Sequence, residues 1–229
     1  MYFKVLFMTD QQQSLEAIHD IKRMMERSSR FISLSGLSGI SAGICALVGS
    51  WFASPYVFGR KNLFIDVNAP FNKDYTVFLN MWLFWIAAAT FLTALISAFL
   101  FTYIKSSKEG IPIWGSSARR LLFNVSVPLI TGGIFLFKLV QYGTFGLVAP
   151  GCLLFYGLAL INASKYTLVE IKYLGYCQLL LGIINLWLVG YGLYFWAAGF
   201  GILHIVYGAY MWNKYDRNPA AAQGKRVNQ

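Results

Sequence analysis

The chain has 229 residues, of which 57% are hydrophobic and only 12% are charged, whereas a soluble domain carries roughly 25% charged residues. Together with a mean hydropathy of +0.55, this composition excludes an ordinary soluble domain and predicts an all-α integral membrane protein. The formal net charge of +10 does not indicate nucleic-acid binding. The lysines and arginines gather at the ends of apolar runs, where they set topology and meet anionic head groups of the bilayer.

Residues 1–29 form the first expected segment, which we place in the cytoplasm. From residue 9 onward it is polar, with Leu15, Ile18 and Met25 at helical spacing, and this pattern predicts an amphipathic helix over residues 9–29. The helix is either an anchor on the membrane surface or a docking site for a soluble partner or a second copy. The sequence leaves open whether Met1 or Met8 is the start.

The first apolar run, residues 31–58, has small residues along one side of a helix. A ridge of small side chains lets two transmembrane helices approach closely. We expect this ridge to pack either within the bundle or against a second copy, which would make a homo-oligomer. Its members are Ser35, Gly39, Gly43, Ala46 and Ser50.

Five further apolar runs follow, each at least as long as the roughly 20 residues that a hydrocarbon core of about 30 Å requires. Six spans place both termini on one side of the membrane. That side carries fifteen lysines and arginines and the other side three, with Lys138 near a span end counted on neither, so the positive-inside rule predicts cytoplasmic termini. The five runs cover residues 76–104, 121–140, 144–163, 168–189 and 191–212, giving a six-helix transmembrane bundle over residues 30–212 and a polar cytoplasmic tail over residues 213–229.

An internal repeat is indicated in the second half of the chain. The third and fourth spans resemble the fifth and sixth at a shift of 49 to 51 residues: Gly133-Ile134 recurs as Gly182-Ile183, and Tyr156-Gly157 recurs as Tyr207-Gly208. The matches predict a parallel repeat of helical hairpins, as in some transporter families. The alternative is that apolar helices share these residue types by composition alone.

The sequence contains no signature of a hydrolase, kinase, zinc peptidase or dinucleotide-binding protein. Two histidines cannot build a histidine-rich metal site, and the three cysteines lie inside apolar runs without CxxC spacing. We therefore expect no catalytic residue, no cofactor and no metal site, and we read the protein as not an enzyme.

Three polar residues in or next to the spans remain as candidate functional residues. His204 and Asn185 lie inside the sixth and fifth spans, where a polar group either faces a polar cavity or bonds to a neighbouring helix. Glu170 lies at the inner start of the fifth span, and we expect it to pair with Arg119 or Arg120 at the inner start of the third.

The segment Met25–Gly39, followed by Ala42-Gly43, resembles the start of a family of small, uncharacterised bacterial polytopic inner-membrane proteins. The resemblance covers about residues 24–50. It implies a location in the bacterial inner membrane and a shared topology, and it transfers no catalytic or binding residue.

Three functions follow from these observations. The first is a structural or regulatory membrane component that contacts the lipid bilayer and docks a cytoplasmic partner on residues 9–29. The second is a small-solute or proton-coupled transporter that uses polar residues in the fifth and sixth spans, and the third is an intramembrane enzyme acting on lipid. The surroundings of His204 discriminate the first two, because dry helix packing favours a structural role and a wet polar cavity favours transport.

Overall fold

The structure is a computed structural model that describes residues 35–58, 73–109 and 114–217. Over these residues the chain is helical and contains no strand. The α-helices are α2 (Gly36–Phe58), α3 (Lys73–Glu109), α4 (Ser116–Gln141), α5 (Val148–Ala163), α6 (Ile171–Trp187), α7 (Gly192–Trp196) and α8 (His204–Met211). Two 3₁₀ turns, η1 (Phe145–Leu147) and η2 (Val189–Tyr191), precede α5 and α7, and two π-helical segments, η3 (Ala197–Leu203) and η4 (Trp212–Asp216), flank α8.

Five helical stretches in the described residues are long and apolar enough to cross a membrane. The expectation of a multi-pass, all-helical membrane protein is therefore confirmed. The expected fifth span, residues 168–189, corresponds to α6, which has 17 residues and is not among these five stretches. The five stretches are Gly36–Val57, Trp82–Lys108, Ser116–Gln141, Phe145–Ala163 and Val189–Asp216.

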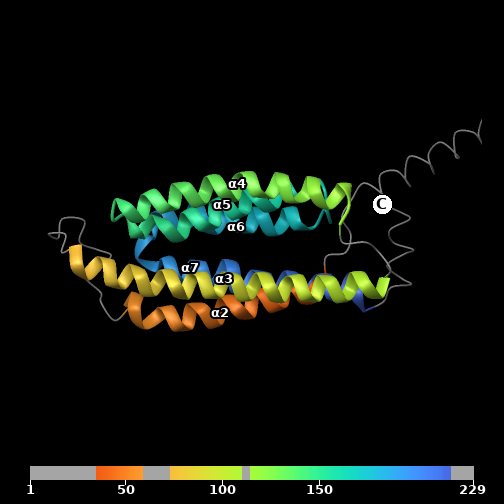
Figure 1. Ribbon diagram of the computed structural model, residues 1–229, viewed down its shortest axis with the longest axis horizontal. Coiled ribbons are helices and arrows are strands. Elements are labelled where there is room, and N and C mark those ends of the chain that lie inside the picture. The colour runs from red at the N-terminus through yellow and green to blue at the C-terminus, as the bar shows by residue number, and fades with distance from the viewer. Residues whose placement is uncertain (1–34, 59–72, 110–113, 218–229) are drawn as a thin grey trace, which may run out of the picture.

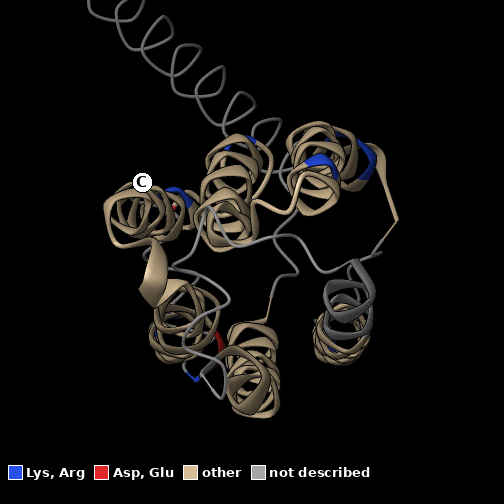
Figure 2. Ribbon diagram, turned by 90° about the vertical axis from the view of Figure 1, so that its left-hand side faces the viewer, with Lys and Arg blue, Asp and Glu red and all other residues tan. Residues whose placement is uncertain are grey.

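The helices lie in two layers. One layer contains α4, α5 and α6, and the other contains α2, α3 and the continuous run from α7 to η4 (Figure 1). Within the first layer α5 packs along both α4 and α6, and within the second α2 packs along α3 and along η3 and α8. The run from α7 to η3 also joins the layers, because α5 packs on α7 and α6 packs on η3. Figure 2 shows the two rows of helices end on.

Helix boundaries follow the apolar runs, with one difference that matters for function. The last helix continues to Asp216, four residues past the expected end of the sixth span, because its final turn makes polar contacts that are described below. The predicted amphipathic helix over residues 9–29 and the tail beyond residue 217 lie outside the described residues.

The turn between α4 and α5 requires a glycine. Gly143 has φ 74°, in the left-handed region that L side chains rarely adopt. Its amide donates to the carbonyl of Val140 at 3.1 Å, and the next amide, of Thr144, donates to Leu139 at 2.9 Å. Three residues, 142–144, connect α4 to η1, and α5 then runs back along α4.

Candidate functional site

His204 is held between helices by both of its ring nitrogens. It begins α8, is 7% exposed, and places Nδ1 2.9 Å from the carbonyl oxygen of Gly199. A carbonyl only accepts, so Nδ1 carries the proton and donates. In the neutral ring Nε2 is then an acceptor, and it accepts from the hydroxyl of Tyr156 on α5 at 2.8 Å. Phe200 stacks on the imidazole with ring centroids 6.0 Å apart, so a second aromatic ring lies beside the hydrogen-bonded pair of His204 and Tyr156.

The carbonyl of Gly199 joins two further elements. It also accepts from Nε2 of Gln178, a fully buried side chain on α6, at 2.8 Å. A Cβ at Gly199 would lie 2.5 Å from Oε1 of Gln178, so a side chain at this position would displace the amide. Since Gly199 lies in the π-helical segment η3, this one carbonyl connects η3 with α6 and, through His204 and Tyr156, with α5.

Asn185 has a different neighbourhood. It is fully buried near the end of α6, and its Nδ2 donates to the carbonyl of Leu188 at 2.9 Å, in the turn that leads to η2. Its Oδ1 is buried and has no hydrogen-bond partner among the described residues. No hydrogen bond of the described residues joins Asn185 to His204, so these two candidates act at separate places.

The small-residue ridge of α2 packs within the chain. A Cβ on Gly39 would lie 3.1 Å from the Cα of Gly208, and a Cβ on Gly43 would lie 2.7 Å from the carbonyl oxygen of Gly201. Glycines thus face glycines where α2 crosses η3 and α8. The other members differ: Ala46 is buried, Ser35 is buried and bonds to Asp216, and Ser50 donates to the carbonyl of Leu47 on its own helix.

Glu170 pairs with the last helix and not with α4, so the expected partners were wrong. Its Oε1 accepts from Nζ of Lys214 at 2.6 Å and from the hydroxyl of Tyr215 at 2.5 Å. Arg119 and Arg120 are exposed and make no ion pair with it. The reason is the extension of the last helix through η4, which carries Lys214 and Tyr215 to the start of α6.

The charge of Glu170 is stabilised by these contacts. Burial alone raises the pKa of its carboxyl, but the hydrogen bonds from Lys214 and Tyr215 outweigh burial and hold the pKa below its ordinary value. Glu170 is therefore a structural anion that connects α6 with η4.

Asp216, which the sequence analysis assigned to the polar tail, ties three elements together. Its Oδ2 accepts from the backbone amide of Gly36 at 2.9 Å and from the hydroxyl of Ser35 at 3.3 Å, at the N-terminus of α2. Its Oδ1 lies 2.7 Å from Nζ of Lys105 near the end of α3. A carboxylate at a helix N-terminus satisfies free amides and complements the helix dipole. The feature of the sequence that could have indicated this role is a single acidic residue after the last apolar run.

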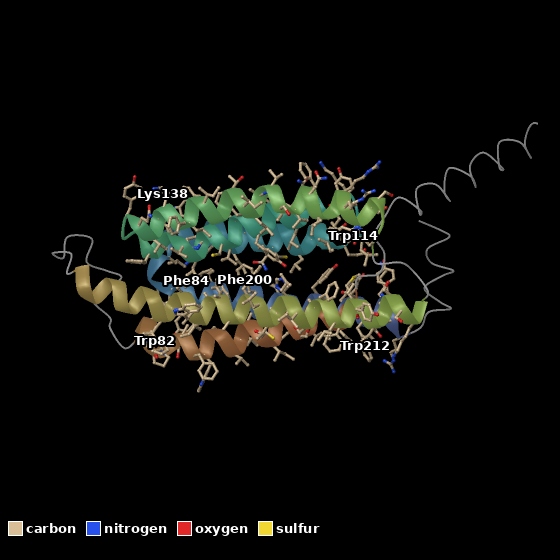
Figure 3. All side chains as sticks on the ribbon, in the orientation of Figure 1. Trp82, Phe84, Trp114, Lys138, Phe200 and Trp212 are labelled. Carbon is tan, nitrogen blue, oxygen red and sulfur yellow. The ribbon has the colours of Figure 1, made fainter. Side chains whose placement is uncertain are left out.

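A cavity of about 350 Å³ lies between the C-terminal half of α2, residues 83–90 of α3, and the N-terminal ends of α5 and α7. Its lining is almost wholly apolar, and Figure 3 shows one lining residue, Phe84, between the two layers. Of the three residues with a hydroxyl in the lining, Ser50, Tyr56 and Thr90, two bond to their own helices, since Ser50 donates to Leu47 and Thr90 donates to Ile86 at 2.7 Å. Neither His204 nor Asn185 is among the described residues that line it.

Comparisons of the chain with protein-family models, with curated proteins and with solved structures find no match. The resemblance over residues 24–50 stays a prediction.

Proposed function

We propose that the protein is a six-span membrane component with a structural or regulatory role, and not an enzyme. The observation that carries the proposal is the bonding of His204. Both of its ring nitrogens are engaged by Tyr156 and Gly199, and the nearby cavity is apolar and does not include it. Polar side chains that form hydrogen bonds between helices stabilise the association of transmembrane segments.

The proposal adds α6, the fifth span in chain order, to the five stretches that are long and apolar enough to cross a membrane. Its 17 residues rise about 26 Å, close to the core thickness of about 30 Å. The charge distribution supports cytoplasmic termini, and the resemblance over residues 24–50 supports the bacterial inner membrane. Both second-half hairpins reverse through a 3₁₀ turn, η1 and η2, which supports the proposed parallel repeat.

A docking role for residues 9–29 belongs to the same proposal. The amphipathic pattern of this segment and its place ahead of the first span support contact with a cytoplasmic protein.

A small-solute or proton-coupled transporter is the alternative, and one observation favours it. His204 follows the π-helical segment η3, and π-helical insertions occur frequently at functional sites. An intramembrane enzyme acting on lipid has no observation of its own in support.

A double-mutant cycle on Tyr156 and His204 tests the proposal. We expect Tyr156→Phe and His204→Leu each to destabilise the bundle, with a coupling of about 0.6 to 1.7 kcal/mol, the size measured for hydrogen bonds between transmembrane helices. Tyr176→Phe on the exposed face of α6 is the matched control, and we expect it to leave stability unchanged.

The same variants are reconstituted in liposomes that contain a pH-sensitive dye. The proposal predicts that wild-type protein and Tyr156→Phe pass protons no faster than protein-free liposomes. A proton flux through the wild-type protein that Tyr156→Phe abolishes would contradict the proposal and favour the transporter.

A further inference from the structure

The cavity between the two layers is closed on several sides and open to lipid on another. Its walls come from α2, α3, the end of α4, η1 with α5, and η2 with α7. Of these, α3 packs along α2 but makes no comparable contact with α4, α5 or α7. The side of the cavity next to α3 is therefore not sealed by helix packing.

The rim of this opening is lipid-facing surface. On α3 the lining residue Phe84 is 64% exposed, and its neighbour Trp85, which forms an edge-to-face pair with it, is exposed as well. In a membrane these apolar side chains meet acyl chains. The cavity is thus continuous with the hydrocarbon around the protein.

Water is a poor occupant of this space. A buried water needs two to four polar partners. The hydroxyls of Ser50 and Thr90 are already bonded to their own helices, so the hydroxyl of Tyr56 is the one remaining hydroxyl among the described lining residues, which is fewer partners than a water needs. An empty cavity would forfeit the dispersion contacts of its lining. Hydrocarbon restores those contacts without any polar requirement.

We infer that this cavity is a binding site for one acyl chain of a membrane phospholipid, which enters between α3 and the α4–α5 hairpin. A methylene takes up about as much space as a water molecule, roughly 30 Å³, so about 350 Å³ holds on the order of ten methylenes of one chain. A free fatty acid fits less well, because the described residues that line the cavity include no lysine or arginine to pair with a carboxylate. A phospholipid keeps its head group outside, at the membrane surface.

Photolabelling tests the inference with the full chain. The protein is reconstituted with a phosphatidylethanolamine that carries a diazirine near the end of one chain. It is then exchanged into detergent to remove loosely associated lipid, irradiated, and mapped by peptide mass spectrometry. We expect label on Ala149 and Cys152, which line the cavity, at least fivefold above label on Phe123 and Phe137, which are exposed on α4.

Two variants on α3 form a matched pair. Ala87 lines the cavity, whereas Ala89 is exposed on the same helix and does not line it. We expect Ala87→Trp to reduce label on Ala149 and Cys152 at least fivefold, and Ala89→Trp to change it less than twofold. Melting temperatures of both variants control for folding.

A variant on the opposite wall keeps the test decisive if Ala87→Trp fails to fold. Gly190 also lines the cavity, and a Cβ there meets no atom within 4 Å, so Gly190→Trp introduces a ring without a backbone clash. It should reduce the label as Ala87→Trp does. Label on the cavity residues no higher than on Phe123, as expected if another part of the chain fills the space or the helices close it, would overturn the inference. Equal label on the cavity residues in the Ala87→Trp and Ala89→Trp variants would also overturn the inference.

Discussion

When single glycines are replaced by alanine, the structure predicts the order of stability of the variants. Gly43 faces the backbone of η3, and a methyl group there would lie 2.7 Å from the carbonyl oxygen of Gly201 and from Cγ1 of Ile205. Gly39 is less confined, with the nearest atom at 3.1 Å. Gly133, exposed on α4, has no atom within 4 Å of a Cβ and is the control.

The expected difference in the free energy of unfolding between these variants has two contributions. Alanine in place of glycine inside a helix gains about 0.5 to 1 kcal/mol at any of these positions, so this term cancels between variants. Overpacking a close contact costs about 1 to 3 kcal/mol. We therefore expect Gly43→Ala to be about 1 to 3 kcal/mol less stable than Gly133→Ala, with Gly39→Ala in between.

Unfolding of the purified protein in mixed micelles, with SDS as denaturant and circular dichroism as the signal, measures the ranking. Size-exclusion chromatography with light scattering checks that the oligomeric state is the same in all three variants. If Gly43→Ala is as stable as Gly133→Ala, α2 does not cross η3 and α8 at its glycines, and the packing described here is wrong.

Three further predictions concern the inner end of the bundle and the N-terminal segment. Asp216→Ala should destabilise the protein more than Asp216→Asn, because the amide still accepts from the N-terminus of α2; a lost N-cap costs about 1 kcal/mol, and denaturant titration of both variants measures the difference. The pKa of Glu170 is lowered in the folded state, so its stabilising contribution is complete above the ordinary value of 4.5 and is lost as the pH falls below it; Glu170→Gln should flatten the acid limb of the stability profile, and an unchanged limb would contradict the ion pair. A synthetic peptide of residues 9–29 should stay largely unfolded with anionic liposomes if the segment docks a protein, and circular dichroism showing a helix on the liposomes would instead indicate a membrane anchor.

Five of the six expected spans were predictable, because hydropathy reports directly on which residues the bilayer accepts. The ridge of α2 was predictable for a related reason, since small residues at helical spacing mark a close approach. The partner of the ridge was not, because a pattern on one helix does not say which other helix it meets. Gly201 and Gly208 emerge as that partner only from the order of the helices around the bundle.

The same limit explains the error at Glu170. Several cations lie near the same membrane depth, and sequence position alone does not select among Arg119, Arg120 and Lys214. The continuation of the last helix to Asp216 decides the pairing, and it follows from the contacts that its final turn makes. The cavity was equally hidden, since it arises where parts of several helices fail to fill the space between them.

The central claim is that His204 is sealed within helix packing, and thiol accessibility tests it most directly. His204→Cys is placed in a background in which Cys45, Cys152 and Cys177 are alanine, and a charged, membrane-impermeant thiol reagent is added to either side of reconstituted liposomes. Tyr142→Cys, at the 79% exposed turn between α4 and α5, is the positive control. The account predicts reaction at position 142 and none at position 204 from either side. Reaction at position 204 would mean that water reaches this depth, and it would contradict the structural role.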